Sequence, residues 1–479
     1  MTDRKSRLDQ PLSRRAILKG SLVTTTALGA LTIGKAGPMH FISEAYATAP
    51  QLKAGEKAIG NFPSKTSGST ITIGLNLPLT GAYADEGADE LKAYQLAADH
   101  LNGKGDGGLI PTLKPAAAGL KAGKGILGKQ VVLVQNDSHT AADVARAGAQ
   151  QMIQRDGAIM ITGGSSSAEA IAIQSLCQDS GIIFMAGLTH SNDTTGKDRR
   201  RYGFRHFFDA YMSGQALGPL LSAQYGKDRK AYHLTADYTW GWTQESSMKG
   251  ATEKNGWQTV AAVRTPLGAT DYSQYLTPVL NSGADVLILN HYGTDMVTSL
   301  KQAVAFGLRD KQANGKPFQI VVPLISELMA AGAGDAIKGI YGTSNWNYKL
   351  TDEGTKALTA SFGKVYGKPP SQAAQTVYVQ TIMYANAVET AGTFYPPTVI
   401  KTLEGFKFDG MGNGPTEYRA TDHQAFKDIL IVQGKQKPDN QFDLLDIVKV
   451  VPRKDVEYDP NIPDFNPDGK AALGPYEPA

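Results

Sequence analysis

The chain has 479 residues, 41% of them hydrophobic and 19% charged, which is typical of a soluble globular protein with two or three domains. The first 49 residues contain seven Lys or Arg and three Asp or Glu, so the total of +3 leaves a net charge of −1 for the remainder. A body without a basic excess argues against a nucleic-acid partner. The single cysteine, Cys177, excludes an intrachain disulfide and is expected to be a small buried hydrophobe.

Residues 1–49 predict an export signal. Ser13 to Lys19 (SRRAILK) precedes a moderately apolar run from Ser21 to Gly34, and Ala45-Tyr46-Ala47 offers small residues for a signal peptidase. A run of about 14 residues is too short for the ~20 that span a bilayer. The paired arginines resemble a twin-arginine (Tat) signal, with Ile17 in place of the commoner Phe. No cysteine follows the run, so we expect a periplasmic protein without a lipid anchor.

The folded part is expected to begin after a polar arm at 50–70. Residues 71–77 alternate apolar and polar side chains, and Pro78 and Gly81 then break the pattern, which predicts a strand and a loop. A helix follows, because apolar residues recur at helical spacing: Leu91, Tyr94, Ala97, Ala98 and Leu101. In open α/β sheets, ligands bind at such carboxyl ends of strands.

The alternation of strands and helices continues along the chain and predicts βαβ units with parallel sheets. A first series has strands at 130–138, 158–164 and 182–187 with helices at 140–156 and 165–181. A second series has strands at 230–237, 258–266, 284–293 and 318–326 with helices at 243–256, 272–283 and 294–307. The helix 371–392 is expected to return to the first lobe, and 427–435 to add a last strand to the second. The Gly/Pro/Lys-rich segment 102–128 is expected to be a surface insertion.

Together these elements resemble the type I periplasmic binding proteins, and more narrowly the branched-chain amino acid and amide-binding subunits of ABC importers. The stretches that carry the resemblance are IGLNLPLTG, YADEG, FRHFFDAYMSGQA and RATDHQ, and it covers residues 71–435. It implies an α/β fold of two doubly wound parallel-sheet lobes joined by a three-crossover hinge. The expected parts are a signal peptide (1–49), an arm (50–70), lobe 1 (71–206 and 341–404), lobe 2 (207–340 and 405–450) and an irregular tail (451–479).

The first candidate ligand loop is Gly163-Gly164-Ser165-Ser166-Ser167, which ends a strand and opens a helix. Free amides at a helix N-terminus attract anions, and serine is a natural cap. In the resembled family a hydroxyl of this loop binds the ligand α-carboxylate, and Ser167 matches that place, with Ser166 one residue away. A serine cap without any ligand is the alternative.

The second candidate loop follows the next strand. In the family it binds the ligand ammonium through a backbone carbonyl and a Thr hydroxyl. One alignment places Leu188 at the carbonyl and His190 in place of the Thr, and a shift by one residue places Gly187 and Thr189 there instead. A surface role for His190 is a further alternative.

The second lobe is expected to close on the ligand with aromatic side chains. Trp240 and Tyr292 match family ligand aromatics at two strand ends, and aromatic faces suit an apolar group or a cation. A core position for Trp240 is the alternative. Glu327 is the one carboxylate near the place where some relatives hold the ammonium.

The sequence departs from the family at the first loop. Several relatives carry an aromatic residue immediately before the glycine matched by Gly87, whereas here Glu86 stands there and Tyr83 lies three residues earlier. This substitution puts a branched-chain aliphatic ligand in doubt.

Enzyme motifs are absent from the sequence: it contains no Walker loop, no GxGxxG after a strand, no HExxH and no GxSxG. We therefore expect a binding protein without a cofactor or metal, a monomer that delivers an amino acid, amide or related small carboxylate to a membrane permease. A periplasmic sensor of the same fold is the second hypothesis. A periplasmic enzyme using His190 or Asp137 is the third.

Overall fold

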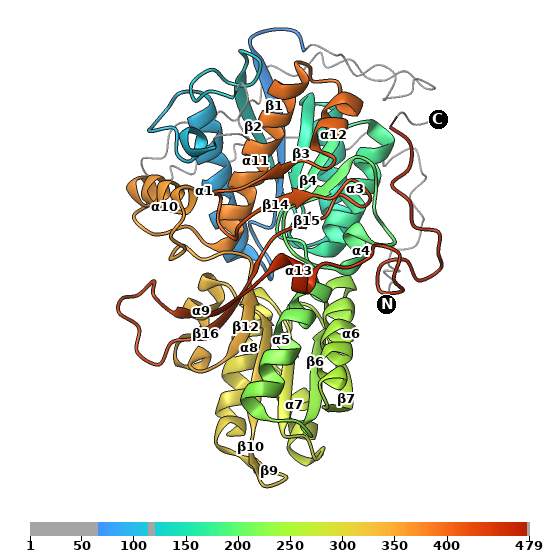
Figure 1. Cartoon of the computed structure of the whole chain (residues 1–479), viewed down its shortest axis with the longest axis vertical. Helices are drawn as coiled ribbons and strands as arrows, with labels where there is room; N and C mark the ends of the chain where they lie inside the picture. Colours follow the sequence, from blue (N-terminus) through green and yellow to red (C-terminus); the bar gives the residue numbers. More distant parts are fainter. Residues whose placement is uncertain (1–65, 114–119, 477–479) are drawn as a thin grey trace, which may run out of the picture. The chain divides into compact units, whose positions relative to one another are not determined.

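The computed structural model of the chain describes residues 66–113 and 120–476 (Figure 1). The predicted signal segment and most of the arm lie outside the described residues. Within the described ranges, no helix is both long enough and apolar enough to cross a membrane.

The first lobe is built on a five-stranded parallel sheet of order β2-β1-β3-β4-β5. Its strands are β1 (Thr70–Leu77), β2 (Gln130–Asp137), β3 (Ala158–Gly163), β4 (Ile183–Ala186) and β5 (Gly203–Arg205). Helices α1 (Ala84–Leu101) and α11 (Gln372–Ala391) pack together in one core cluster, and α2 (Ala142–Gln154) and α3 (Ser167–Ser180) pack in another. Cys177 is fully buried in the second of these clusters, as the apolar run around it predicted.

The second lobe has a seven-stranded sheet of order β17-β16-β12-β11-β8-β6-β7. The strands are β6 (Lys230–Ala236), β7 (Gln258–Thr265), β8 (Val286–Asn290), β11 (Gln319–Leu324), β12 (Tyr341–Ser344), β16 (Ile429–Gly434) and β17 (Leu445–Val451). The first five are mutually parallel, whereas β16 and β17 join as antiparallel strands at one edge. Its helices are α5 (Ala210–Tyr225), α6 (Thr239–Lys254), α7 (Ser273–Asn281), α8 (Gly293–Ala305) and α9 (Glu327–Ala333). The predicted two-lobed α/β fold with parallel sheets is confirmed.

The chain passes between the two sheets three times. The crossovers are 206–209 between β5 and α5, 345–352 between β12 and α10 (Glu353–Tyr366), and 427–428 between β15 (Ala425–Phe426) and β16. Three crossovers are what the sequence resemblance implied.

Two of the lobe boundaries expected from the sequence disagree with the boundaries that strand pairing and side-chain packing indicate. Residues 341–344, expected in the first lobe, form β12 and pair with β11 and β16 of the second sheet. Residues 407–426, expected in the second lobe, form β13 (Lys407–Phe408), β14 (Thr416–Tyr418) and β15, which follow α12 (Pro396–Leu403). Phe408 and Tyr418 of this small antiparallel sheet are buried in the α1–α11 core of the first lobe. The second lobe therefore resumes after the third crossover.

Two segments expected to be peripheral are packed. The described parts of 102–128 bury apolar side chains in the first core: Leu109, Ile110, Leu113, Leu120 and Ile126. In the tail, Tyr458 and Phe465 stack with ring centroids 3.9 Å apart inside the second core, beyond the short helix α13 (Arg453–Val456). The tail is mostly irregular, as expected, but it contributes to the core.

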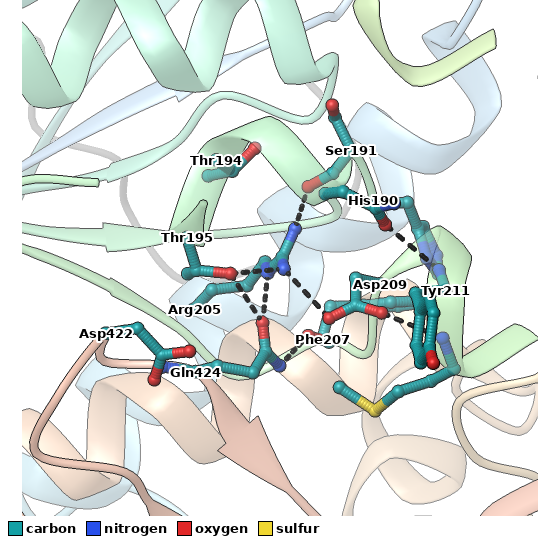
Figure 2. A network of polar contacts seen from close by, with 12 residues as sticks. His190, Ser191, Thr194, Thr195, Arg205, Phe207, Asp209, Tyr211, Asp422 and Gln424 are labelled. Atoms are coloured by element: carbon teal, nitrogen blue, oxygen red, sulfur yellow. Dashed lines mark hydrogen bonds and ion pairs between the residues drawn. The ribbon is translucent and has the colours of Figure 1, made fainter. Parts of the chain in front are cut away.

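A buried polar network joins the first and third crossovers (Figure 2). Arg205, which is fully buried, donates from Nε to Gln424 Oε1 at 2.6 Å and contacts Asp209 Oδ2 at 3.4 Å. Gln424 Nε2 donates in turn to the carbonyl of Phe207 at 2.8 Å, and Arg205 also donates to the carbonyl of Ser191. The network ties the hinge to the loop that follows β4.

Candidate functional site

The two serine-bearing loops of the first lobe are bound to one another. Ser167 Oγ accepts hydrogen bonds from Thr189 Oγ1 at 2.9 Å, from the amide of Ser191 at 2.9 Å and from the amide of His190 at 3.2 Å. Ser166 caps α3 with Glu169, whose Oε2 accepts from the Ser166 amide at 2.9 Å. Ser167 therefore shapes the second loop, and only its own hydroxyl proton is left to donate.

Close packing of backbone brings these loops together. Gly163 has φ of +103°, and a Cβ there would lie 2.0 Å from the carbonyl oxygen of Asn76. The amide of Gly187 donates to the carbonyl of Gly163 at 2.8 Å, and a Cβ at Gly187 would lie 3.2 Å from the same oxygen. Leu188 is buried beside these glycines, in contact with the core of the second lobe.

His190 is buried against the first crossover. Its ring meets Phe207 edge-on at 4.0 Å and Phe208 at 4.7 Å between centroids. Both ring nitrogens are buried without a hydrogen-bond partner among the described residues. Burial, and then the charge of Arg205, hold the pKa of His190 well below its usual value, so the ring is neutral at pH 7. The surface position considered for His190 is therefore wrong.

Four aromatic rings meet where the two lobes touch. Tyr83, at the start of α1, hydrogen-bonds through its hydroxyl to Tyr238 and meets the ring of Tyr292 edge-on at 5.5 Å. Tyr292, at the start of α8, also meets Trp240 edge-on at 6.2 Å. Trp240 is 2% exposed and belongs to the second core, and its Nε1–H has no hydrogen-bond partner among the described residues. Trp240 therefore lies in the core, which was the alternative to a ligand contact, and its ring is also part of the aromatic cluster.

Two carboxyl groups of α1 are buried next to these rings. Glu86 is 1% exposed and Glu90 is fully buried, one helical turn apart. Ser326 Oγ of the second lobe donates to Glu86 Oε1 at 3.1 Å, and Ser165 Oγ of the first lobe donates to Glu90 Oε2 at 2.7 Å. Burial raises the pKa of each carboxyl to about 8.

Glu327 opens α9 and lies beside the second crossover. Its carboxylate accepts from Asn347 Nδ2 at 3.2 Å and from the amide of Gln372 at 3.3 Å, and burial raises its pKa to about 7. Gln372 Nε2 donates to the hydroxyl of Tyr292 at 3.4 Å. Glu327 is therefore linked through Gln372 to the aromatic cluster.

The lobes also touch through backbone. The amide of Thr294 donates to the carbonyl of Ala82 at 3.0 Å. Gly293, with φ of +58°, lies so close that a Cβ would be 2.4 Å from the Ala82 oxygen and 2.6 Å from the Tyr83 ring. Only glycine permits this approach.

We expect Gly293→Ala to hold the lobes apart at this contact, because the added methyl group has no space between Ala82 and Tyr83. Small-angle scattering should show a larger radius of gyration than for the wild type. Gly283→Ala is the matched control: φ there is +75°, but no atom lies within 4 Å of the added Cβ, so it brings backbone strain of about 1–2 kcal/mol without the clash. Identical scattering from the two variants would contradict the steric explanation.

Several residues of this region were not among the sequence candidates: Glu90, Ser165, Tyr238, Ser326 and Gln372. The predicted helix begins after Gly87 and leaves Glu86 in the loop, whereas α1 begins at Ala84, so Glu86 and Glu90 are four residues apart on one helix and share a face. Ser326 and Gln372 reach the site only through the meeting of the lobes, for which the local sequence has no signal. The described residues contain no group of three or more His, Cys, Asp or Glu that could hold a metal ion.

Comparison with known proteins agrees with this architecture. Residues 70–439 match a family model described as periplasmic binding protein. The Leu/Ile/Val-binding protein homolog 8 of Brucella abortus (strain 2308) is 23% identical over 352 residues, 70% of this chain and 80% of its own. A periplasmic binding protein of Burkholderia mallei superposes with a TM-score of 0.71 at 22% identity, over 81% of this chain and 96% of its own.

A solute binding protein of an ABC transporter from Rhodopseudomonas palustris BisB5, solved in complex with 3,4-dihydroxy benzoic acid, superposes with a TM-score of 0.68 at 19% identity. That similarity covers 81% of this chain and 98% of the other. Because the family model spans well over half of the sequence, and because the two-lobed α/β fold agrees, the chain belongs to the periplasmic binding proteins of type I fold, a family of binding proteins rather than enzymes.

Proposed function

We propose that the protein is the periplasmic solute-binding subunit of an ABC importer. It binds one small solute between the loops at the carboxyl ends of its two sheets and delivers that solute to a membrane permease. The observation that carries the proposal is the meeting of Tyr83, Tyr238, Trp240 and Tyr292 from both lobes beside Glu86. Family membership and the ABC transporter neighbour support the transport role.

Hinge bending at the three crossovers would let the lobes enclose the solute. The contacts of Tyr83 with Tyr238 and Tyr292 and the Thr294–Ala82 hydrogen bond form only while the lobes are together, so a ligand that joins the lobes shifts the population toward the closed form. The permease would then bind the closed form. We further propose export by the Tat route and a monomeric state.

For the solute we propose an amino acid, an amide or a related small carboxylate, in line with the names of the relatives. The proposed contact residues are Tyr83, Glu86, Ser166, Ser167, Gly187, Leu188, Thr189, His190, Trp240, Tyr292 and Glu327. Aromatic side chains suit the solute body, and the loop hydroxyls and carboxylates suit its polar end.

A thermal-shift screen of the purified protein tests the function. The panel contains amino acids, amides, urea, polyamines, aromatic acids and short dicarboxylates. A compound present at 100 times its dissociation constant stabilises the folded state by about 2.7 kcal/mol, which raises the melting temperature by degrees. Hits confined to one chemical family would support the proposal. If no compound shifts the melting temperature, and native mass spectrometry finds no co-purified small molecule, the binding function fails.

A further inference from the structure

We propose that the solute carries a cationic nitrogen group, an ammonium, amidinium or guanidinium, which binds against Glu86 and Glu90 of α1. The inference rests on the proposed solute-binding function and narrows its substrate class. It follows from the side chains around this pair.

The two carboxyl groups have only neutral partners. Glu86 accepts from Ser326 at 3.1 Å and Glu90 from Ser165 at 2.7 Å, both through hydroxyl groups. Glu90 Oε1 is buried and has no partner among the described residues. A buried carboxylate without a counter-charge is costly, because desolvation is not offset by an ion pair.

The charged groups around the pair are also acidic. Glu86 and Glu90 lie near each other and near Asp89 of the same helix, and Glu90 also lies near Glu169 of α3. Lys368 is the closest described basic partner of this helix, but its Nζ pairs with Asp89 at 2.5 Å. Among the described residues, no Lys, Arg or His forms an ion pair with either glutamate. The pair therefore holds its protons in the free protein at pH 7, and a bound cation would supply the counter-charge that lets it ionise.

A second and independent observation lies in the aromatic cluster. Trp240 Nε1–H is buried, and nothing in residues 66–113 and 120–476 accepts a hydrogen bond from it, although a buried indole N–H is normally bonded. Tyr292 connects this indole with the carboxyl pair. Its ring meets that of Trp240 edge-on, and burial and then the charge of Glu86 raise the pKa of its hydroxyl. The rings of Tyr83 and Tyr238 complete the cluster. Aromatic faces attract cations, and the free indole N–H needs an acceptor on the same molecule.

An anionic group is disfavoured at the start of α3. The Ser166 amide is already bonded to Glu169, and Ser167 Oγ already accepts three hydrogen bonds. Ser165 Oγ donates to Glu90. Two donors of this loop therefore serve the protein's own carboxyl groups, and these groups would repel an anion whenever they are ionised.

The test measures how the full-length protein binds molecules that have nearly the same shape but are cationic, neutral or anionic. The probes are benzamidine, benzamide and benzoate, and isopentylamine, isovaleramide and isovalerate, added to the panel of the functional screen. Thermal shifts at equal concentration should be largest for the cation of each triplet, and every hit of the wider panel should carry a cationic nitrogen. A stronger neutral or anionic member, or a hit without a cationic nitrogen, would overturn the inference and leave the binding function standing. No hit in either panel, together with no co-purified small molecule in native mass spectrometry, would remove both.

Variants and pH provide the second arm. Glu90→Gln keeps the bond from Ser165 and removes the charge, and it should weaken binding of the hit at least tenfold, whereas Glu253→Gln on the exposed part of α6 should not. Because a cation binds the ionised carboxylates, affinity should rise about tenfold per pH unit below their pKa, from pH 6 to pH 8. Calorimetry in two buffers of different ionisation heat should detect proton release. Unchanged binding by Glu90→Gln, or proton uptake, would contradict the inference.

Discussion

Replacing Arg205 with alanine is expected to lower the free energy of unfolding by about 3–5 kcal/mol. The guanidinium and the carboxylate of Asp209 are both fully buried, and the amino acid change leaves that carboxylate without its cation. It also removes one of two donors to Gln424 Oε1, which keeps Thr195 Oγ1, and one of two donors to the carbonyl of Ser191, which keeps the amide of Thr194. Denaturant unfolding followed by far-ultraviolet circular dichroism measures the loss.

Two further variants separate the buried pair from a general effect of losing arginine. Arg146→Ala removes an exposed guanidinium from α2 and should change the free energy of unfolding by less than about 0.5 kcal/mol. Arg205→Met with Asp209→Leu removes both charges, and it should be less destabilising than the sum of the single changes. A loss below 1 kcal/mol for Arg205→Ala would show that the network does not stabilise the hinge.

The free energy of unfolding is also expected to fall as pH rises from 6.5 to 8. Burial raises the pKa of Glu86 and of Glu90 to about 8, so the folded protein holds protons that the unfolded chain releases above about pH 4.5. A carboxyl group whose pKa is higher in the folded than in the unfolded state contributes its full stabilisation at low pH. That contribution is lost as the pH rises to the pKa of the folded state. Each group should therefore contribute a loss of roughly 2 kcal/mol over this window.

The buried histidines act outside this pH window, whereas Lys427 opposes the glutamates within it: burial lowers the pKa of Lys427 well below its usual value, so the unfolded chain holds a proton that the folded protein lacks. Burial lowers the pKa of His233 and of His291 to about 3, which makes stability rise with pH up to about 6.5 and then stop changing. The pKa of Glu404 is about 2. Desolvation would raise this pKa, but hydrogen bonds from His423 and Tyr476 outweigh desolvation, so Glu404 changes the free energy of unfolding only in acid.

Glu90→Gln should make the slope between pH 6.5 and 8 less steep and should stabilise the ligand-free protein at pH 8. Part of the slope should remain, because Glu86 and also Glu327 and Asp295, whose pKa burial raises to about 7, lose protons in the same window. Glu253→Gln, an exposed change of the same chemistry, should leave the slope intact. Urea unfolding at closely spaced pH values gives the slope directly. A Glu90→Gln protein with the same slope as the wild type would show that this carboxyl is not buried in the free state.

The same carboxyl pair connects stability with binding. Protonated glutamates let the lobes meet without a ligand, through Ser326 and the Thr294–Ala82 contact. A cation that replaces those protons would hold the same lobes together more tightly. Proton release and lobe closure would then both accompany binding of the cation, and Glu90→Gln should reduce both.

The sequence by itself determined the alternation of most of the longer strands and helices between β1 and β11 and the two-lobed α/β class, but it did not predict α4, β5, α5, β9 or β10. These features depend on periodicity, which is local: Ile71, Ile73 and Leu75 alternate, and the helix after them repeats apolar residues at 3.6. It also indicated which strand ends carry ligand candidates, including Trp240 and Tyr292, because parallel strands present their carboxyl ends at one edge.

Only the tertiary structure decided what depends on contacts between distant residues. Strands as short as β12 and β14 carry too little pattern to name their partners, so their lobe depended on packing and register. Ser326 reaches Glu86 across 240 positions, and Ser167 turns inward because Thr189 and the amides of 190 and 191 surround it. Burial and charge at the site are sums over such contacts, and no local stretch of sequence contains them.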